Sequence, residues 1–167
     1  MIGTTEKIQT LQLVQPKIFK SNYEFRIDDK VVGEIRYQGF SGRKAEAVLF
    51  DEKWKFEQTG FWKTFIEYKG EQSPYEKGKL HAKMSCVIEI ADRYNNKYTF
   101  KKAAWWKTCW GWYDQAGNEV IKFKQPVSLK KQAEITVMDR SIMNKSLLIL
   151  LGTVIFIINK RAAAAAM

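Results

Sequence analysis

The most distinctive chemistry of the chain lies in residues 101 to 113, which read KKAAWWKTCWGWY. Four tryptophans are interleaved with lysines there. Indole rings settle at the headgroup level of a bilayer, and lysines attract anionic lipids. The stretch therefore predicts a lipid- or anion-binding surface carried by Lys101, Lys102, Trp105 and Lys107. Two other interpretations stay open, because single-stranded bases also stack on such rings and because Trp110 and Trp112, on one face of a strand, would equally fill a core.

Arg43 and Lys44 are a second basic pair, in a predicted connection, and they complete the set of candidate anion-binding residues. The formal net charge of the chain is +10. Such a charge favours contact with phospholipid headgroups or nucleic acid, although lysines that only keep a domain soluble would produce it too. We therefore expect anionic phospholipids, a membrane surface or a protein partner, and we consider nucleic acid the weaker candidate.

No pattern in the sequence indicates a reaction centre. A nucleophile paired with histidine would have to use His81, the only histidine, which lies in a strand-like stretch. Cys86 and Cys109 are too few for a disulfide framework or a zinc site. The acidic pairs Asp28-Asp29 and Asp51-Glu52 suit turns, where aspartate bonds to the nearby backbone. We expect no catalytic residue, no metal site and no cofactor, and hence a protein that is not an enzyme.

Short runs of alternating apolar and polar residues recur between residues 8 and 138, with the period of half-buried strands. The prolines stand only at positions 16, 74 and 126, all in candidate connections. About twelve short strands at this spacing are typical of an all-β barrel or sandwich. The runs that we assign to strands are 8–13, 23–27, 31–37, 45–50, 54–58, 63–68, 86–90, 98–100, 108–113, 119–123 and 133–138.

The stretch SLLILLGTVIFIINKR, residues 146 to 161, is the one segment apolar enough to concern a membrane. As a helix, its apolar part would cover roughly 18 Å, less than the about 30 Å of a hydrocarbon core. We therefore expect a helix over 141–160, capped by Asp139 or Ser141 and enclosed by strands, with Gly152 admitting a close strand or large ring. A short membrane anchor stays open as the alternative. The helix residues expected to be buried are Leu147, Leu148, Leu150, Leu151, Ile155 and Ile158.

The predicted elements follow a definite order: a strand meander, a last strand ITVMD (135–139) and a terminal hydrophobic helix. This order resembles that of the tubby C-terminal-like superfamily. The superfamily includes the LURP-one-related proteins and the phospholipid scramblases. The resemblance is carried by YEFRIDDKVVGEI (23–35), WYDQAGNEVIKF (112–123) and AEITVMDRSIMNKSLLILLGTVIFI (133–157). It implies a twelve-stranded antiparallel closed barrel around a buried C-terminal helix, in a non-enzymatic, membrane-associated binding protein. The acidic calcium stretch that scramblases carry before the helix is missing, so calcium-triggered lipid movement is not implied.

We expect a single domain over residues 1–161, followed by an Ala-rich tail (162–167) that is disordered or artificial. The first residues, MIGTTEKIQT, lack the apolar segment of a signal peptide, which favours a cytoplasmic protein with membrane association. The favoured function is binding of anionic phospholipid, or of a protein partner at a membrane surface. The alternatives are a β domain anchored in a membrane by residues 146–161 and single-stranded nucleic-acid binding through residues 101–113.

Overall fold

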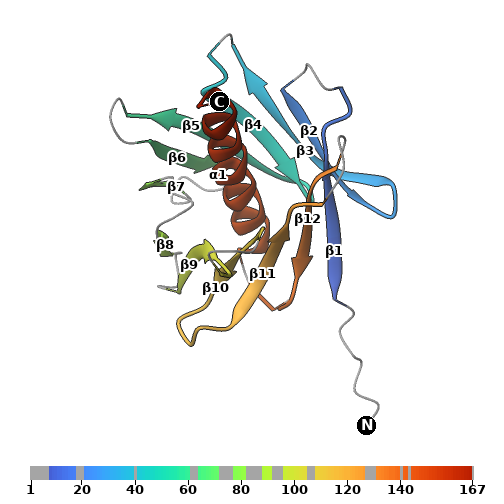
Figure 1. Cartoon of the computed structure of the whole chain (residues 1–167), viewed down its shortest axis with the longest axis vertical. Helices are drawn as coiled ribbons and strands as arrows, with labels where there is room; N and C mark the ends of the chain where they lie inside the picture. The colour runs from blue at the N-terminus through green and yellow to red at the C-terminus, as the bar shows by residue number, and fades with distance from the viewer. Residues whose placement is uncertain are drawn as a thin grey trace.

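The computed structural model describes residues 8–17, 21–39, 41–60, 64–71, 77–81, 88–91 (backbone only), 96–104, 108–126, 131–139, 141–142 and 144–166. Within these residues, twelve strands form one antiparallel sheet and one helix follows them (Figure 1). The elements are β1 (Gln9–Val14), β2 (Asn22–Ile27), β3 (Lys30–Gln38), β4 (Lys44–Leu49), β5 (Glu52–Thr59), β6 (Phe65–Gly70), β7 (Lys77–His81), β8 (Ile88–Ala91), β9 (Lys97–Lys102), β10 (Cys109–Tyr113), β11 (Glu119–Lys124), β12 (Lys131–Val137) and α1 (Lys145–Ala165).

Tight turns and alternating burial explain the hairpins. β4 alternates exposed and buried positions at its start, as expected of a strand with one face in a core. The β2–β3 and β4–β5 hairpins close through Asp28-Asp29 and Phe50-Asp51, with φ values of 49° and 66° in each pair. Positive φ at both central residues is the signature of the type I′ turn, and aspartate tolerates it. The predicted turn role of the acidic pairs is therefore confirmed, although the second turn uses Phe50 instead of Glu52.

The strand order is β7-β6-β5-β4-β3-β2-β1-β12-β11-β10-β9-β8. Two meanders, β1–β7 and β8–β12, are joined where β1 pairs with β12 and Leu11 lies opposite Ile135. Because each strand runs antiparallel to its neighbours, successive connections alternate between the two ends of the sheet. The outermost strands β7 and β8 come within 8 Å of each other (Cα–Cα), and no pairing joins them among the described residues.

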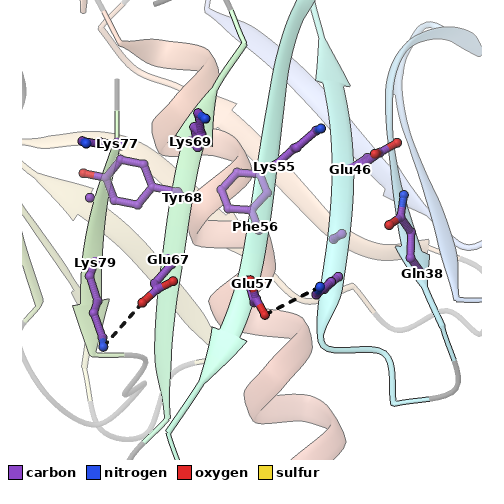
Figure 2. Close-up of a pocket in the computed structure, with 13 residues that line it drawn as sticks. Gln38, Glu46, Lys55, Phe56, Glu57, Glu67, Tyr68, Lys69, Lys77 and Lys79 are labelled. Carbon is purple, nitrogen blue, oxygen red and sulfur yellow. Dashed lines mark ion pairs between the residues drawn. The ribbon is translucent and has the colours of Figure 1, made fainter. Parts of the chain in front are cut away.

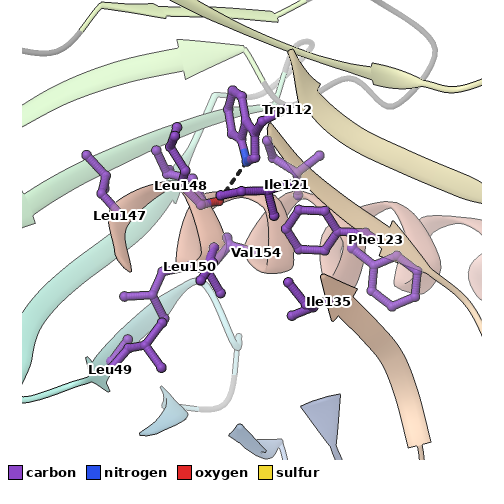
Figure 3. Close-up of a cluster of buried hydrophobic side chains, with 14 of the residues drawn as sticks. Leu49, Trp112, Ile121, Phe123, Ile135, Leu147, Leu148, Leu150 and Val154 are labelled. Atoms are coloured by element: carbon purple, nitrogen blue, oxygen red, sulfur yellow. Dashed lines mark hydrogen bonds between the residues drawn. The ribbon is translucent and has the colours of Figure 1, made fainter. Parts of the chain in front are cut away.

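The helix α1 lies inside the curved sheet, with β4–β6 on one side and β9–β11 on the other (Figure 1). Every residue from Ser146 to Ile158 is buried. A helix that is apolar all round must be enclosed on all sides, and the inward faces of the strands supply that enclosure (Figure 3). Relative exposure is 9% or less for all the helix residues expected to be buried: Leu147, Leu148, Leu150, Leu151, Ile155 and Ile158.

The closest contact between helix and sheet is at Gly152. A Cβ at this position would collide with the ring of Phe123 and would lie 3.0 Å from Nε1 of Trp112. The same Nε1 donates a hydrogen bond of 2.7 Å to the carbonyl oxygen of Leu148, one turn earlier (Figure 3). Glycine is therefore required for the approach of two large rings, which confirms the role predicted for Gly152.

The helix begins and ends later than predicted. It spans Lys145–Ala165 rather than 141–160, and no side chain caps its first turn. Asp139 instead accepts hydrogen bonds from the backbone N and the Oγ of Ser141, at 2.9 and 2.5 Å, in a turn that precedes the helix. The alanines from 162 to 165 continue the helix instead of forming a disordered tail, because alanine has the highest helix propensity of all residues.

The prediction of an antiparallel β fold with one C-terminal helix is confirmed, and each predicted strand overlaps an observed one. The strand β7 was not among the predicted strands; only its last residue, His81, was assigned to a strand-like stretch. Its sequence, KGKLH, contains two lysines and a glycine, which are depleted in strands, so its pairing with β6 decides its conformation. Gly78 leaves room there for the hydroxyl end of the Tyr68 ring on β6, which a Cβ would displace.

Candidate functional site

Basic residues gather at the end of the sheet that the C-terminus of α1 reaches. Strand directions alternate, so this end holds the strand ends that are joined by the β1–β2, β3–β4, β5–β6, β7–β8, β9–β10 and β11–β12 connections. Together with one strand residue on each side, these connections contain no Asp or Glu in their sequence. We call this the basic end. Its described basic residues are Lys17, Arg43, Lys44, Lys102, Lys124 and Lys131. The sequences of the same connections also contain Lys20, Lys63, Lys83, Lys107 and Lys130, which lie outside the described residues.

At the opposite end of the sheet, which we call the acidic end, the sequence of every connection contains acidic residues. Several have structural partners: Asp114 accepts a hydrogen bond of 2.8 Å from the backbone N of Asn118, and Glu119 accepts one of 2.8 Å from the Tyr113 hydroxyl. Burial and this second bond raise the pKa of Tyr113 to about 12. The sequences of these connections and their flanking positions contain ten acidic residues, Asp28, Asp29, Asp51, Glu52, Glu71, Glu76, Asp92, Asp114, Glu119 and Asp139, and six basic ones, Lys30, Lys77, Arg93, Lys97, Arg140 and Lys145. Of these, Glu76, Asp92, Arg93 and Arg140 lie outside the described residues.

The last turns of α1 are held at the basic end by two strands, β3 and β12, and by the β3–β4 connection. Arg161 donates a hydrogen bond of 3.4 Å to the Gly42 carbonyl in the β3–β4 connection, and its guanidinium lies 4.4 Å from the ring centre of Tyr37. Lys160 Nζ donates a hydrogen bond to Oε1 of Gln132 on β12. Two cationic side chains of the helix therefore join the basic end.

Burial perturbs two of these groups. It lowers the pKa of the Lys160 ammonium, because the charged form loses hydration. It also raises the pKa of the Tyr37 hydroxyl far above its usual range, although the nearby Arg161 works in the opposite direction. Tyr37 is thus a neutral ring that supports a guanidinium, a favourable cation–π arrangement.

The structure places four of the six sequence-predicted anion-binding residues, and they lie at the basic end or next to it, around two separate strands. Arg43 and Lys44 are exposed where β4 begins, whereas Lys101 and Lys102 end β9. The sheet order separates β4 from β9 by β3, β2, β1, β12, β11 and β10. Trp105 and Lys107 lie outside the described residues.

The tryptophans of the same stretch divide between core and rim. Trp112 is fully buried, as the core interpretation expected. Trp110 is half-buried, with its ring 5.7 Å from that of Phe156 on α1 and the Lys102 ammonium 5.9 Å from its centre. The Lys101 ammonium lies 4.6 Å from the ring centre of Tyr113. Lysines and aromatic rings are therefore in contact along β9 and β10, with α1 behind them.

A second charged surface lies on the outer face of β3–β7, away from α1 (Figure 2). It forms a groove of about 780 Å³. Side chains alternate between the two faces along these strands. The inward positions hold the apolar residues, and the outward positions hold residues that are almost all charged. The polar residues that line the groove with outward side chains are Gln38, Lys44, Glu46, Lys55, Glu57, Glu67, Lys69, Lys77 and Lys79.

The strand register arranges the charges of this face in two rows. In the first row Lys44, Glu57, Glu67 and Lys79 follow one another across β4–β7, and its two ends are ion pairs, Lys44–Glu57 at 4.0 Å and Lys79–Glu67 at 3.5 Å (Figure 2). We call it the paired row. In the second, Lys55 lies directly opposite Lys69, and Lys69 directly opposite Lys77. We call these three residues the lysine row.

The lysine row is only partly neutralised. Lys55 makes an ion pair of 3.8 Å with Glu71, whereas Lys69 and Lys77 pair with no described acidic residue. Sequence reasoning missed this row, since the three lysines belong to three strands and only the register places them opposite one another. The charge difference between the two ends could have been found from the sequence, because alternate connections of a meander share an end.

The described part of the chain offers little to a metal or to a reaction. No three His, Cys, Asp or Glu residues come together there to hold an ion. The His81 ring lies 5.0 Å from the ring of Phe65, and the described cysteine, Cys109, is a half-buried thiol. Within the described residues, α1 is the one helix long and apolar enough to cross a bilayer, and 67% of its apolar window is buried in the protein.

Comparisons of the chain with protein-family models, with curated proteins and with solved structures found no match. The functional interpretation therefore rests on the two charged surfaces and on the enclosed helix.

Proposed function

We propose that the chain is a non-enzymatic β domain that docks through its basic end onto an anionic phospholipid surface. The observation that carries this proposal is the separation of charge, with a basic end free of acidic residues in its connections and an acidic end opposite. Charges near a membrane act within a Debye length of about 8–10 Å, so a basic end attracts anionic lipid more strongly than the same charges spread over the surface. The anionic leaflet is the cytoplasmic one, where we place this docking.

The composition of the basic end favours a lipid surface over a partner that is bound by charge alone. The sequences of the same connections contain large apolar residues beside the lysines, as in KIFK (17–20), GFW (60–62) and AAWWK (103–107). Aromatic rings at headgroup level add to the roughly 1 kcal/mol that each nearby Lys or Arg contributes. Docked in this way, the C-terminal turns of α1 face the lipid and the acidic end points away from it.

Sedimentation with liposomes tests the proposal with two matched variants. One replaces Lys17, Arg43 and Lys124 by Gln at the basic end, and the control replaces Lys30, Lys53 and Lys97, which are equally exposed but lie away from it. At roughly 1 kcal/mol per charge, the first variant should bind vesicles containing phosphatidylserine on the order of 100-fold more weakly. The control should bind nearly as wild type, and salt should weaken binding.

Equal losses in the two variants would contradict oriented docking and leave only net charge as the cause. Equal sedimentation with purely phosphatidylcholine vesicles would contradict the lipid charge preference. Single-stranded oligonucleotide that binds through Lys17, Arg43 and Lys124 at physiological salt, with no vesicle binding, would favour the nucleic-acid alternative instead.

The tail-anchor alternative requires α1 to leave the sheet. Burying a Leu or Ile side chain contributes about 1.5–3 kcal/mol, and α1 buries eight such residues among Leu147–Ile158. Withdrawal of the helix would expose these side chains together with the strand faces that enclose them. The core position of α1 therefore supports surface docking over a membrane span.

We further propose that the sheet closes between β7 and β8 into a tubby-like barrel around α1. The proximity of these two outermost strands and the burial of the helix on all sides support closure. Hydrogen–deuterium exchange tests it, because a closed barrel protects the amides of β7 and β8 as well as those of its central strands. Rapid exchange confined to these two strands would identify open edges.

A further inference from the structure

The lysine row is an arrangement that stability alone does not explain. Like charges directly opposite each other on neighbouring strands are destabilising, and here the arrangement occurs twice in succession, at Lys55–Lys69 and at Lys69–Lys77. The paired row beside it also contains a like-charge contact, Glu57 opposite Glu67, but each of these glutamates has a lysine partner on its other side. Lys69 and Lys77 have no such partner among the described acidic residues. The lysine row therefore calls for a negative partner that the described part of the chain does not supply in full.

The shape of the surface decides the kind of partner. The groove crosses β3–β7 and is open along its length, and the side chains of Lys55 and Lys79 remain 56% and 53% exposed (Figure 2). A single small anion there would stay in contact with water and would gain little from long, mobile lysines. A longer partner that crosses the strands would meet all three lysines at once.

Spacing then selects the form of that partner. Neighbouring strands lie about 4.8 Å apart, so the lysine row presents a positive group at about this interval. Residues three or four apart on one face of a helix are about 5–6 Å apart. Glu46 lies directly opposite Lys55 and adds a negative charge next to the lysine row; on its other side it faces Arg36, which pairs with Glu34. A helix laid across the strands would place three carboxylates over the lysines and a basic residue, one turn earlier, over Glu46.

We propose that this face binds an acidic helical segment of a partner protein, with carboxylates at i+4, i+7 and i+11 and a basic residue at i. The lysine row lies on the outer face of β5–β7 and not at the basic end. Docking of the basic end on lipid would therefore leave the lysine row accessible. The protein would then hold an acidic partner at a membrane surface, although this second contact forms whether or not the lipid contact does.

Fluorescence anisotropy with a labelled synthetic helix tests the proposal on the full chain in the absence of lipid. The probe carries Lys at i and Glu at i+4, i+7 and i+11, and a second peptide of identical composition spreads its glutamates round the helix. We expect the first to bind and the second to bind more weakly. The double variant Lys69→Gln/Lys77→Gln should weaken binding of the first peptide on the order of tenfold, whereas the charge-matched control Lys30→Gln/Lys97→Gln should not.

A charge exchange makes the contact specific. Lys69→Glu should abolish binding of the first peptide, and replacing the Glu at i+7 of the peptide by Lys should restore it. Failure of this rescue, or equal losses in the two double variants, would overturn the proposal. A small anion is the competing occupant, and tripolyphosphate is its probe. If tripolyphosphate binds through Lys69 and Lys77 and displaces the peptide at equal concentration, the proposal is overturned in favour of a small-anion site.

Discussion

The two ends of the sheet are built from different residues, although the same strands join them. At the acidic end, backbone geometry accounts for the sequence: Asp28-Asp29 closes a type I′ turn, and Asp114 and Asp139 bond to backbone N–H groups two to four residues ahead. At the basic end the connections contain lysines and aromatic residues that no tight turn requires. This difference indicates that the acidic end is organised for folding and the basic end for contact with another surface.

The largest effect should come from removing the helix that lies between the two ends. Deletion of residues 145–167 would expose the inward faces of the strands, and the loss should exceed the 5–15 kcal/mol by which domains are stable. We expect a chain without a cooperative thermal transition and without dispersed amide resonances in nuclear magnetic resonance spectra. A soluble, folded truncated domain would show instead that α1 is an anchor.

A smaller loss should follow from filling the space above Gly152. In Gly152→Val the new side chain would collide with Phe123 and crowd Trp112, and overpacking of this kind costs about 1–3 kcal/mol. Urea unfolding measures the change. Ala163→Val, exposed in the same helix, is the control, because it carries only the lower helix propensity of valine, at most about 0.7 kcal/mol. Equal costs at the two positions would rule out the close ring contact.

Substitutions in the lysine row and in the paired row, both on the outer face of β3–β7, should change the free energy of unfolding in opposite directions. Lys69→Gln removes two like-charge contacts and should raise the free energy of unfolding by about 0.2–1 kcal/mol, whereas Lys79→Gln breaks the pair with Glu67 and should lower it by a similar amount. Chemical denaturation in urea at low salt measures both. The difference should shrink at 1 M salt, where the Debye length is about 3 Å. A loss of stability in both variants would mean that the lysine row is already neutralised within the protein.

The smallest effect should come from the turn at the acidic end. Replacing Asp28-Asp29 by Asn-Gly keeps the type I′ geometry, with residues that favour it more strongly, and should raise stability by about 0.5 kcal/mol. It also removes two negative charges on the side away from the proposed lipid contact. Liposome binding should therefore change by less than twofold. A large gain in binding would show that the acidic end lies close to the lipid and would reverse the orientation that we propose.

Much of the architecture could be predicted from local patterns. The alternation of residues such as Tyr23, Phe25 and Ile27 identified strands, and the uniformly apolar run from Leu147 identified a helix that must be enclosed. The helix boundaries were less accurate, since Asp139 and Ser141 bond to each other in a turn and the alanines propagate the helix. The candidate site was predicted in part: Arg43, Lys44 and Lys102 do share one end, but long-range pairing between strands brings them there.

What the sequence by itself determined is every feature that depends on near neighbours in the chain: the strand period, the aspartate turns, the enclosed helix and the net charge of +10. Tertiary structure alone decided that Lys55, Lys69 and Lys77 stand opposite one another and that Gly152 lies beneath Phe123 and Trp112. The reason is that register is a relation between strands. A shift of one residue would turn each of these side chains to the other face without any change in local pattern.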